Sequence, residues 1–317
     1  MGHDIVIEEQ LEIEVGSKNS KKINAPFGYF GAKNKIALQI CSNLPPHNCW
    51  VEAFCGSAAL TLSKTKAQIE IVNDIDNDIV NFFQQLRDNS RELIRLINLT
   101  PYAEQELNLA RTEILDLSPI ERARRFLVQS MMAINGVFGN ERGGFSYSDS
   151  YTRNGHEARV NRWNNLPERL DAVVQRLKAV RIENKDARKL IKRYLNRPAT
   201  LLYLDPPYLG ERTKGYNIDA NDEKFHTELL KLANKAQCMV FISGYENDLY
   251  ESILSEERGW STKKIKTHTK GSNGTLHERI EVLWMNQFFT TALESNMMPV
   301  ELTVEEAKQK KVNPERK

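Results

Sequence analysis

Residues 201 to 208, LLYLDPPY, place an acid, two prolines and a tyrosine directly after a short apolar run. The apolar residues 201–204 predict a strand that is buried on both faces, as the central strands of parallel sheets are. The strand must end at Asp205, because proline donates no hydrogen bond to a sheet and disfavours helical geometry in the residue before it. We therefore expect Asp205 at the carboxyl edge of a sheet, where open α/β sheets bind their ligands.

The residues Asp205, Pro206, Pro207 and Tyr208 suit the chemistry of an exocyclic amine on a nucleobase, whose lone pair is delocalised into the ring. The Asp205 carboxylate and the free carbonyl group of Pro206 could each accept one amine hydrogen, which localises the lone pair for attack. Tyr208 could stack on the base, a contact worth roughly 1–3 kcal/mol. The alternative interpretation is a strand-ending turn, since Asp and Pro also favour turns.

The motif DPPY after an apolar strand resembles the catalytic motif of Dam-like DNA adenine-N6 methyltransferases. The resemblance implies that S-adenosylmethionine is the methyl donor, that DNA is the substrate, and that Asp205 also lies against the donor. It extends over roughly residues 23 to 288, where further motifs similar to those of the family follow in the family's order.

The segment PFGYFGAK precedes a helix predicted at about 34–44 and resembles the amino-terminal motif of the same family. In the family this segment closes over the methionine part of the donor, and Ala32 stands where a second glycine is usual. Without that context, a packed turn before a helix is the favoured interpretation. The residues that the resemblance assigns to cofactor binding here are Phe27, Tyr29, Gly31 and Lys33.

The segment VEAFCGSAAL runs from an apolar strand through Phe54 and Gly56 into a helix. A glycine at such a turn lets the backbone approach an adenosine cofactor. The family commonly has a second glycine where this chain has Ala58. Asp74 follows Gly56 at about the 20-residue spacing at which α/β cofactor domains place the acid for the ribose hydroxyl groups. Asp76 is the competing candidate, although it could instead cap the next helix.

Asp186 follows a strand predicted at about 179–183. The resemblance implies that its carboxylate accepts a hydrogen bond from the amino group of the donor's adenine. It could also cap the helix that begins with ARKLIKRYL, so a structural role stays open. We predict a structural role for His226, because methylation of an amine scarcely requires a general base.

Residues 101–165 interrupt the pattern with helices and then with a loop rich in Gly, Asn, Ser and Arg, in which aromatic residues are interleaved. Arginine and asparagine suit phosphates and base edges, and aromatic side chains can fill the gap left by a flipped base. On composition alone, a solvated surface loop is the favoured interpretation. In members of the resembling family, the corresponding segment recognises the target sequence. The candidate DNA-binding residues here are Arg142, Arg153, Arg159 and Arg162.

The composition is that of an ordinary globular chain, with 317 residues, 40% hydrophobic and 27% charged, and a net charge of +2. No apolar run is long enough to cross a membrane, and the beginning lacks the pattern of a secretory signal. The four cysteines lack metal-ligand spacing. We therefore expect a cytoplasmic protein with free thiols, no metal site and no membrane association. The small net charge does not itself indicate a polyanionic partner, although residues 101–200 carry a basic surplus.

Helices alternate largely with the predicted strands, which favours an α/β fold with a mostly parallel sheet. The strands are predicted at about 49–53, 69–73, 179–183, 200–204, 238–243, 262–267 and 280–285. We expect a Rossmann-like methyltransferase sheet with an inserted helical, loop-rich recognition region. The predicted units are a polar tail at 1–22, a cofactor-binding and catalytic domain at 23–100 and 166–289, the insertion at 101–165, and a polar tail at 290–317.

The predicted function is site-specific transfer of a methyl group from S-adenosylmethionine to N6 of a flipped-out adenine in double-stranded DNA, with a companion restriction endonuclease as a further expectation. Methylation of RNA adenine or of cytosine N4 is the alternative, although cytosine enzymes usually have Ser in the place of Asp205. An inactive nucleic-acid-binding homologue is a second alternative, favoured by Ala32 and Ala58. The recognised site and the oligomeric state are not encoded in any recognisable pattern.

Overall fold

The structure is a computed structural model that describes residues 23–28, 33–134, 136, 143–149, 151–153, 155–209, 222–270 and 276–299. For residues 267–270 and 276–279 it describes the backbone alone. No helix within these ranges is long and apolar enough to cross a lipid bilayer.

A seven-stranded sheet forms the centre of the protein, in the order β5-β2-β1-β6-β7-β9-β8. Its strands are β1 Cys49–Glu52, β2 Ile69–Asn73, β5 Val180–Glu183, β6 Thr200–Leu204, β7 Met239–Gly244, β8 Trp260–Lys270 and β9 Leu276–Asn286. The five strands from β5 to β7 are parallel, whereas β9 is antiparallel to both of its neighbours. The prediction of a mostly parallel α/β sheet is therefore confirmed, and the parallel strands bring their carboxyl ends to one edge.

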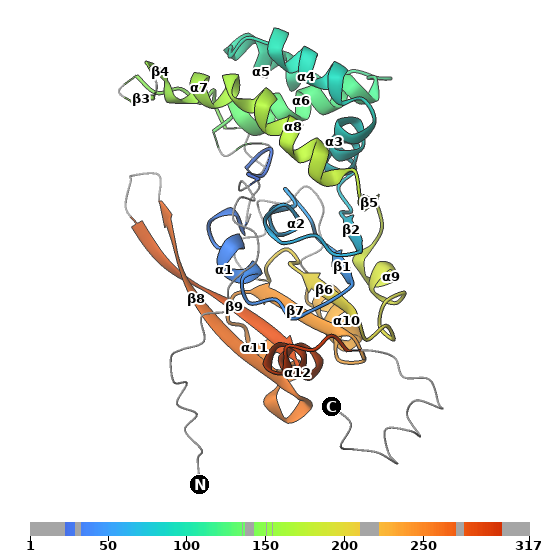
Figure 1. The fold of residues 1–317 in the computed structure, drawn as a ribbon. Helices are drawn as coiled ribbons and strands as arrows, with labels where there is room; N and C mark the ends of the chain where they lie inside the picture. The colour runs from blue at the N-terminus through green and yellow to red at the C-terminus, as the bar shows by residue number, and fades with distance from the viewer. Residues whose placement is uncertain are drawn as a thin grey trace.

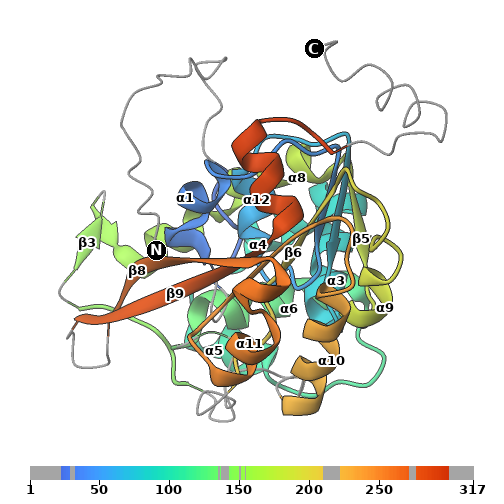
Figure 2. The ribbon, with the colours of Figure 1, turned by 90° about the horizontal axis from the view of Figure 1, so that it is seen from below.

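Side chains alternate between the two faces of the sheet, and helices cover both faces (Figure 2). On one face the rings of Trp50, Tyr203 and Phe241 form a row, with neighbouring centroids 6.1 and 4.6 Å apart. This face is covered by α1 Ala37–Cys41, α2 Ala59–Ser63 and α12 Gln287–Ser295. The other face packs against α9 Ala187–Ile191, α10 Glu223–Ala233 and α11 Asp248–Ile253. The site therefore stands on a sheet that is buried on both sides.

A group of helices gathers at the β5 end of the sheet (Figure 1). They are α3 Asn77–Asp88, α4 Ser90–Leu99, α5 Glu104–Ala110, α6 Pro119–Met132, α7 Ala158–Asn164 and α8 Leu166–Leu177. Their apolar faces form one core that includes Val72 of β2 and Val180 of β5. The described part of 101–165 thus shares its core with α3, α4 and α8, and the division of the chain into domains stays a prediction.

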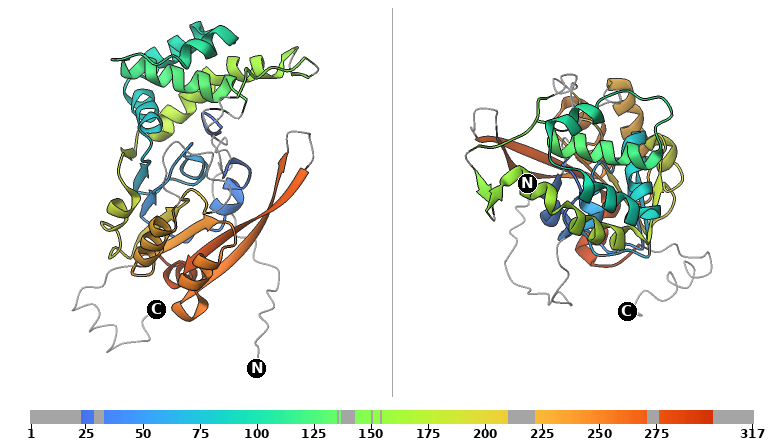
Figure 3. Two further views of the ribbon diagram at one scale, coloured as in Figure 1. Left: turned by 180° about the vertical axis from the view of Figure 1, so that it is seen from behind. Right: turned by 90° about the horizontal axis from the view of Figure 1, so that it is seen from above.

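Two β-ribbons lie on the same side of the molecule (Figures 1 and 3). One is the long antiparallel pair of β8 and β9 at the end of the sheet. The other is a two-stranded hairpin of β3 Thr152–Arg153 and β4 His156–Glu157, beside the helix group.

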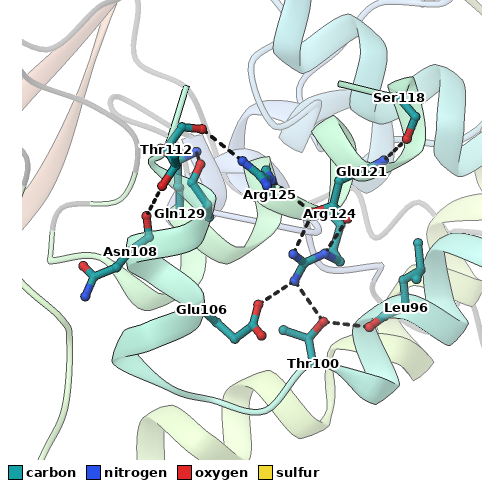
Figure 4. Close-up of polar contacts among 11 residues, drawn as sticks. Leu96, Thr100, Glu106, Asn108, Thr112, Ser118, Glu121, Arg124, Arg125 and Gln129 are labelled. Carbon is teal, nitrogen blue, oxygen red and sulfur yellow. Dashed lines mark hydrogen bonds and ion pairs between the residues drawn. The ribbon is translucent and has the colours of Figure 1, made fainter. Parts of the chain in front are cut away.

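Charged side chains hold the helices of this group together, each opposite a carboxylate (Figure 4). Arg124 on α6 donates to Glu121 at 2.7 Å, to Glu106 of α5 at 2.8 Å and to the hydroxyl group of Thr100 at 3.1 Å. The next residue, Arg125, donates to Glu121 at 3.0 Å. These arginines are structural, because their charge is neutralised inside the fold.

Several predicted bounds differ from the structure. The helix expected at about 34–44 is a short turn, η1 Lys33–Lys35, followed by α1. Helix α10 begins at Glu223, three residues before His226, and Asp222 caps it by accepting from the Phe225 N–H. Strands β8 and β9 are longer than predicted, since pairing with each other extends them beyond the apolar residues that mark them in the sequence.

Candidate active site

Asp205 follows β6 directly and lies at the sheet edge predicted for it. All five residues of β6 are buried, and the strand pairs in parallel with β1 and with β7. Ser243 on β7 donates to Oδ1 of Asp205 at 2.8 Å, and its hydroxyl oxygen lies 2.8 Å from that of Tyr203. The central strands thus hold one carboxylate oxygen in place.

Lys33 connects the amino-terminal motif to the DPPY motif. Its Nζ atom lies 2.8 and 2.9 Å from the two carboxylate oxygens of Asp205 and donates to the Tyr208 hydroxyl group at 2.7 Å. Burial lowers the pKa of Lys33, but the carboxylates of Asp205 and Glu281 outweigh that effect and raise it overall. The ammonium group is therefore charged at neutral pH, and it brings three of the predicted residues together.

Glu281 completes this centre, and the sequence analysis did not identify it. Its side chain is buried, its Oε1 accepts a hydrogen bond from the Tyr208 hydroxyl group at 2.6 Å, and it lies 3.4 Å from Lys33 Nζ. Burial raises the pKa of Glu281, opposed by Lys33 and assisted by Asp205. The residue sits inside the run IEVLWMN, and only the antiparallel pairing of β9 with β7, Val282 opposite Gly244, carries it to this edge.

The proline and tyrosine positions of the motif differ in exposure. Pro206 is buried, whereas Pro207 and Tyr208 are half-buried. The Tyr208 ring lies edge-on to that of Tyr245, with centroids 4.4 Å apart and an interplanar angle of 67°. Burial holds the pKa of Tyr208 well above its ordinary value, so its hydroxyl group stays protonated and able to donate.

The loops after β1 and β2 form the second part of the site. Gly56 has a φ of +46°, and its N–H donates to Asp74 at 2.8 Å, while the Asp76 N–H donates to the other oxygen of Asp74 at 3.0 Å. Burial raises the pKa of Asp74 to about 6. The Cys55 thiol, 4.0 Å away, and the Ile75 backbone also interact with this carboxylate, so the loops after β1 and β2 hold it in place.

Ala58 adopts the left-handed backbone conformation, with a φ of +54°. Glycine is favoured there because it has no Cβ, which explains the glycine common in the resembling motif. The departure at Ala58 therefore places a buried methyl group on a strained backbone. Its direct effect is therefore on the local backbone strain.

Two of the acidic candidates cap helices. Asp76 is the N-cap of α3 and accepts from the Asp78 N–H at 2.8 Å. Asp186 is the N-cap of α9, accepts from the Arg188 N–H at 2.8 Å and pairs with the Arg188 guanidinium group at 2.5 Å. That guanidinium group holds the pKa of Asp186 below its ordinary value. The capping alternative thus holds for both residues, and the binding role of Asp186 stays a prediction.

The aromatic candidates separate into two places. The half-buried ring of Phe54 lies edge-on to Phe225 of α10, 6.3 Å away, and the Arg188 guanidinium group lies 4.9 Å from the centroid of the same Phe225 ring. Phe54 and Arg188, the ion-pair partner of Asp186, thus lie against the same ring of α10. In contrast, Phe27 is 1% exposed and packs edge-on against Phe82 and Phe126 in the helical core.

The core around Phe27 also contains Cys55 and Ala58 of the loop after β1, and the binding role of Phe27 stays a prediction. Its ring is apolar on both faces and is enclosed by aromatic neighbours, so it supports the core below the motif. Tyr29, Gly31 and Arg142 lie outside the described residues.

His226 is fully buried, and its Nδ1 lies 2.8 Å from the Tyr250 hydroxyl group. Burial lowers the pKa of His226 to about 4, so its imidazole is neutral near pH 7. This environment supports the structural role predicted for it.

A cavity of about 600 Å³ opens between the β3–β4 hairpin and helices α7 and α8. Four arginines line it and no described acid does; they are Arg153, Arg159, Arg162 and Arg169. Tyr147 and Tyr151 stand at its rim and are 65% and 62% exposed. We call this feature the arginine cavity. Arg169 was not predicted; it lies on α8, whereas Arg162 lies on α7, and the packing of the two helices brings both to the cavity.

The four arginines of this cavity form no ion pair with any residue that the structure describes. Burial, with Arg159 nearby, lowers the pKa of Arg162; burial and Arg162 lower that of Arg169 to about 10. Arg169 and Arg162 also border the amino-terminal motif: Arg169 Nη2 lies 3.5 Å from the Pro26 carbonyl oxygen, and Arg162 lies against Gly28. The cavity therefore gathers positive charge that no described carboxylate pairs with, beside the segment that leads to Lys33.

Comparison with known proteins gives one family. Residues 29–270 match the family model of the D12 class N6 adenine-specific DNA methyltransferases. The Type II methyltransferase M1.LlaDCHI of Lactococcus lactis subsp. cremoris is 26% identical over 280 residues, which cover 82% of this chain and 94% of that protein.

Similarity to solved structures is low. A candidate RNA methyltransferase of Pyrococcus horikoshii matches with a TM-score of 0.36 and 8% identity, covering 84% of this chain and 89% of that one. The precorrin 8W decarboxylase of Methanobacterium thermoautotrophicum matches with a TM-score of 0.35 and 8% identity, covering 80% and 89%. Scores at this level add nothing to the family match.

Proposed function

The chain belongs to the D12 class of N6 adenine-specific DNA methyltransferases, and we propose that Asp205 and Pro206 hold the target amine during transfer. S-adenosylmethionine supplies a methyl group on a sulfonium centre, and adenine N6 in DNA accepts it. In the proposed arrangement the Asp205 carboxylate accepts one amine hydrogen and the carbonyl group of Pro206 accepts the other. The N6–methyl bond forms as the sulfur–methyl bond breaks, and N6 then releases one proton.

The observation that carries this proposal is the position of Asp205 at the carboxyl end of a central, fully buried strand. Ser243 and Lys33 fix both of its carboxylate oxygens. A fixed acceptor needs no reorganisation when the amine arrives, which is the condition for efficient electrostatic stabilisation.

The residues after β1, β2 and β5 fit the methyl donor. Asp74, after β2, is the proposed acceptor for the ribose hydroxyl groups, Gly56 brings backbone close to the ligand, and Phe54 with Asp186 flanks the place of the adenine. Lys33 would border the methionine part. We include Tyr29 and Gly31 in this proposal from their place in the motif alone.

The target adenine would be flipped out of the duplex, because its amine is otherwise paired and stacked. Tyr208 offers the ring on which the flipped base stacks. The arginine cavity is the proposed contact with the phosphate backbone, since guanidinium groups without an internal carboxylate are available for an external anion. Arg142, outside the described residues, belongs to the same proposed surface.

The protein is further proposed to methylate a short recognised site and to act beside a companion endonuclease. The support is the similarity to a Type II methyltransferase. The insertion at 101–165 is the proposed recognition region, with the two exposed tyrosines of the arginine cavity as candidates to contact bases.

The activity is tested by incubating the purified protein with S-adenosylmethionine and DNA from a methylase-free strain, followed by mass spectrometry of the nucleosides. We expect N6-methyladenine in DNA, no N4-methylcytosine, and no methyladenine when RNA of the same sequence is supplied. Methylation of RNA alone, or of cytosine, would contradict the proposed substrate.

A further inference from the structure

We propose that Glu281 is a positioning residue for the methyl transfer, which shares the Lys33 ammonium group with Asp205 and draws it away when the target amine donates to Asp205. The inference rests on the proposed role of Asp205 and assigns a task to a residue in the middle of β9. It is carried by the contacts of three charged groups at the edge of the sheet.

The Asp205 carboxylate is nearly saturated in this structure. Oδ1 accepts from Lys33 at 2.8 Å and from Ser243 at 2.8 Å, and Oδ2 accepts from Lys33 at 2.9 Å. Three of about four acceptor positions are thus in use. One position is left for an incoming amine, which would share the carboxylate with the Lys33 ammonium group.

Glu281 offers the ammonium group a second anion without a large movement. Its Oε1 lies 3.4 Å from Lys33 Nζ, within ion-pair distance, and it is as buried as Lys33, each being 5% exposed. Because charge interactions strengthen away from water, a small displacement of Lys33 between two carboxylates changes its partner at low cost. A shared cation can therefore leave Asp205 without becoming unpaired.

Tyr208 links this exchange to the base. Its hydroxyl group accepts from Lys33 at 2.7 Å and donates to Glu281 at 2.6 Å. Glu281 thus anchors the ring proposed to stack on the target adenine and also the cation that would share Asp205 with its amine. One side chain positions both, which a merely packed carboxylate would not do.

The groups that face Glu281 determine how it titrates. They are Lys33 of η1, Asp205 and Tyr208 after β6, and Tyr203 of β6. Burial raises the pKa of Glu281, with Asp205 adding to the increase and Lys33 opposing it. The charge that attracts Lys33 is therefore present at high pH and is lost as the pH falls through this raised pKa.

The test uses Glu281→Gln, which keeps the acceptor oxygen for Tyr208 and removes the charge. We expect kcat to fall about 10- to 100-fold, as for a small displacement of a reacting group, with the dissociation constant of S-adenosylmethionine and the melting temperature near those of the wild type. The acid limb of the kcat profile against pH should also disappear. Glu246→Gln, at a 57% exposed carboxylate paired with Lys264, is the matched control and should change none of these quantities.

A double-mutant cycle with Lys33→Met separates positioning from packing. Without the ammonium group there is nothing to share, so Glu281→Gln should cost little further activity in that background. Lys33→Gln replaces Lys33→Met if the latter does not fold. An equal loss in both backgrounds, or wild-type kcat with an unchanged acid limb in Glu281→Gln, would overturn the inference. An active Asp205→Ala variant would instead refute the proposed role of Asp205, so the two failures are distinguishable.

Discussion

The sheet edge and the arginine cavity differ in whether their charged side chains have partners of opposite charge. At the edge, Lys33 lies between Asp205 and Glu281, and each charge has a partner within 3.4 Å. In the arginine cavity, four guanidinium groups have no carboxylate partner among the described residues, although burial disfavours the charge of two of them. The charges of the first arrangement are paired within the protein, whereas those of the second are the proposed contact for an external anion.

This difference indicates which region suits catalysis and which suits binding of a polyanion. A paired, buried centre holds its atoms in place and suits chemistry, because preorganised groups do not move as charge develops. An unpaired basic surface gains free energy only on binding a polyanion, through the release of counterions. Arg124 of α6 shows that the chain supplies carboxylates where arginine is structural, so the lack of them at the cavity is informative.

The largest expected effect is at the paired centre. Asp205→Ala removes the acceptor of the amine hydrogen and should lower the rate of methyl transfer by about 10³-fold. Binding of S-adenosylmethionine, measured by calorimetry, should change little, because the proposed ribose contact is Asp74. Asp248→Ala on the exposed start of α11 is the control. Near-normal transfer by Asp205→Ala would refute the mechanism.

The next effect concerns the donor. Asp74→Asn should weaken S-adenosylmethionine binding by roughly 10- to 100-fold, since hydrogen bonds to a charged group are worth about 1.5–3 kcal/mol. The pKa of Asp74 is raised to about 6, so the carboxylate that accepts the hydroxyl groups is lost as the pH falls through 6. Wild-type affinity should therefore decline below that pH, and the variant should not share the decline. A decline of the same size in both proteins would exclude Asp74 as its cause.

A smaller effect is expected at the arginine cavity. Arg162→Gln and Arg169→Gln should each weaken DNA binding roughly tenfold and reduce the slope of log affinity against log salt by about 0.9, the value for one lost phosphate contact. Arg95→Gln, at an exposed arginine paired with Glu92, should leave the slope unchanged. Wild-type slopes in both cavity variants would show that the cavity does not bind phosphates.

The smallest effect is at Ala58, between the two regions. Ala58→Gly relieves the strain of a left-handed alanine, but it loses a buried methyl group and gains entropy in the unfolded chain, so the free energy of unfolding should change by less than about 1 kcal/mol. Ala58→Val should lower it by more than about 2 kcal/mol, because a branched residue tolerates this backbone poorly. Urea unfolding measures both changes. An unchanged free energy of unfolding in Ala58→Val would contradict the assigned strain.

The sequence predicts the parallel part of the fold well, because its signals are local. The apolar run before Asp205 and the proline that follows are enough to end β6 at the sheet edge, and the order of the strands alternates with helices as expected. The capping of α3 by Asp76 was likewise foreseen as an alternative, since a cap needs only its own helix.

The residues that sequence reasoning missed are placed by contacts between segments that are far apart in the chain. Glu281 reaches the centre only because β9 runs antiparallel beside β7, a relation that no local pattern specifies. Phe27 lies in a motif that resembles a cofactor segment, yet aromatic rings of α3 and α6 enclose it. Arg169 has an ordinary place on an amphipathic helix, and its lack of an acid partner appears only when the helices pack.

The most direct test of this division of labour is a single-turnover methylation with saturating DNA and S-adenosylmethionine, in Asp205→Ala and in the double variant Arg162→Gln/Arg169→Gln. Asp205→Ala should bind DNA with the wild-type salt slope and transfer no methyl group on the time scale of the wild type. The arginine variant, once saturated, should transfer at the wild-type rate. Wild-type transfer by Asp205→Ala, or a slow chemical step in the saturated arginine variant, would contradict the account.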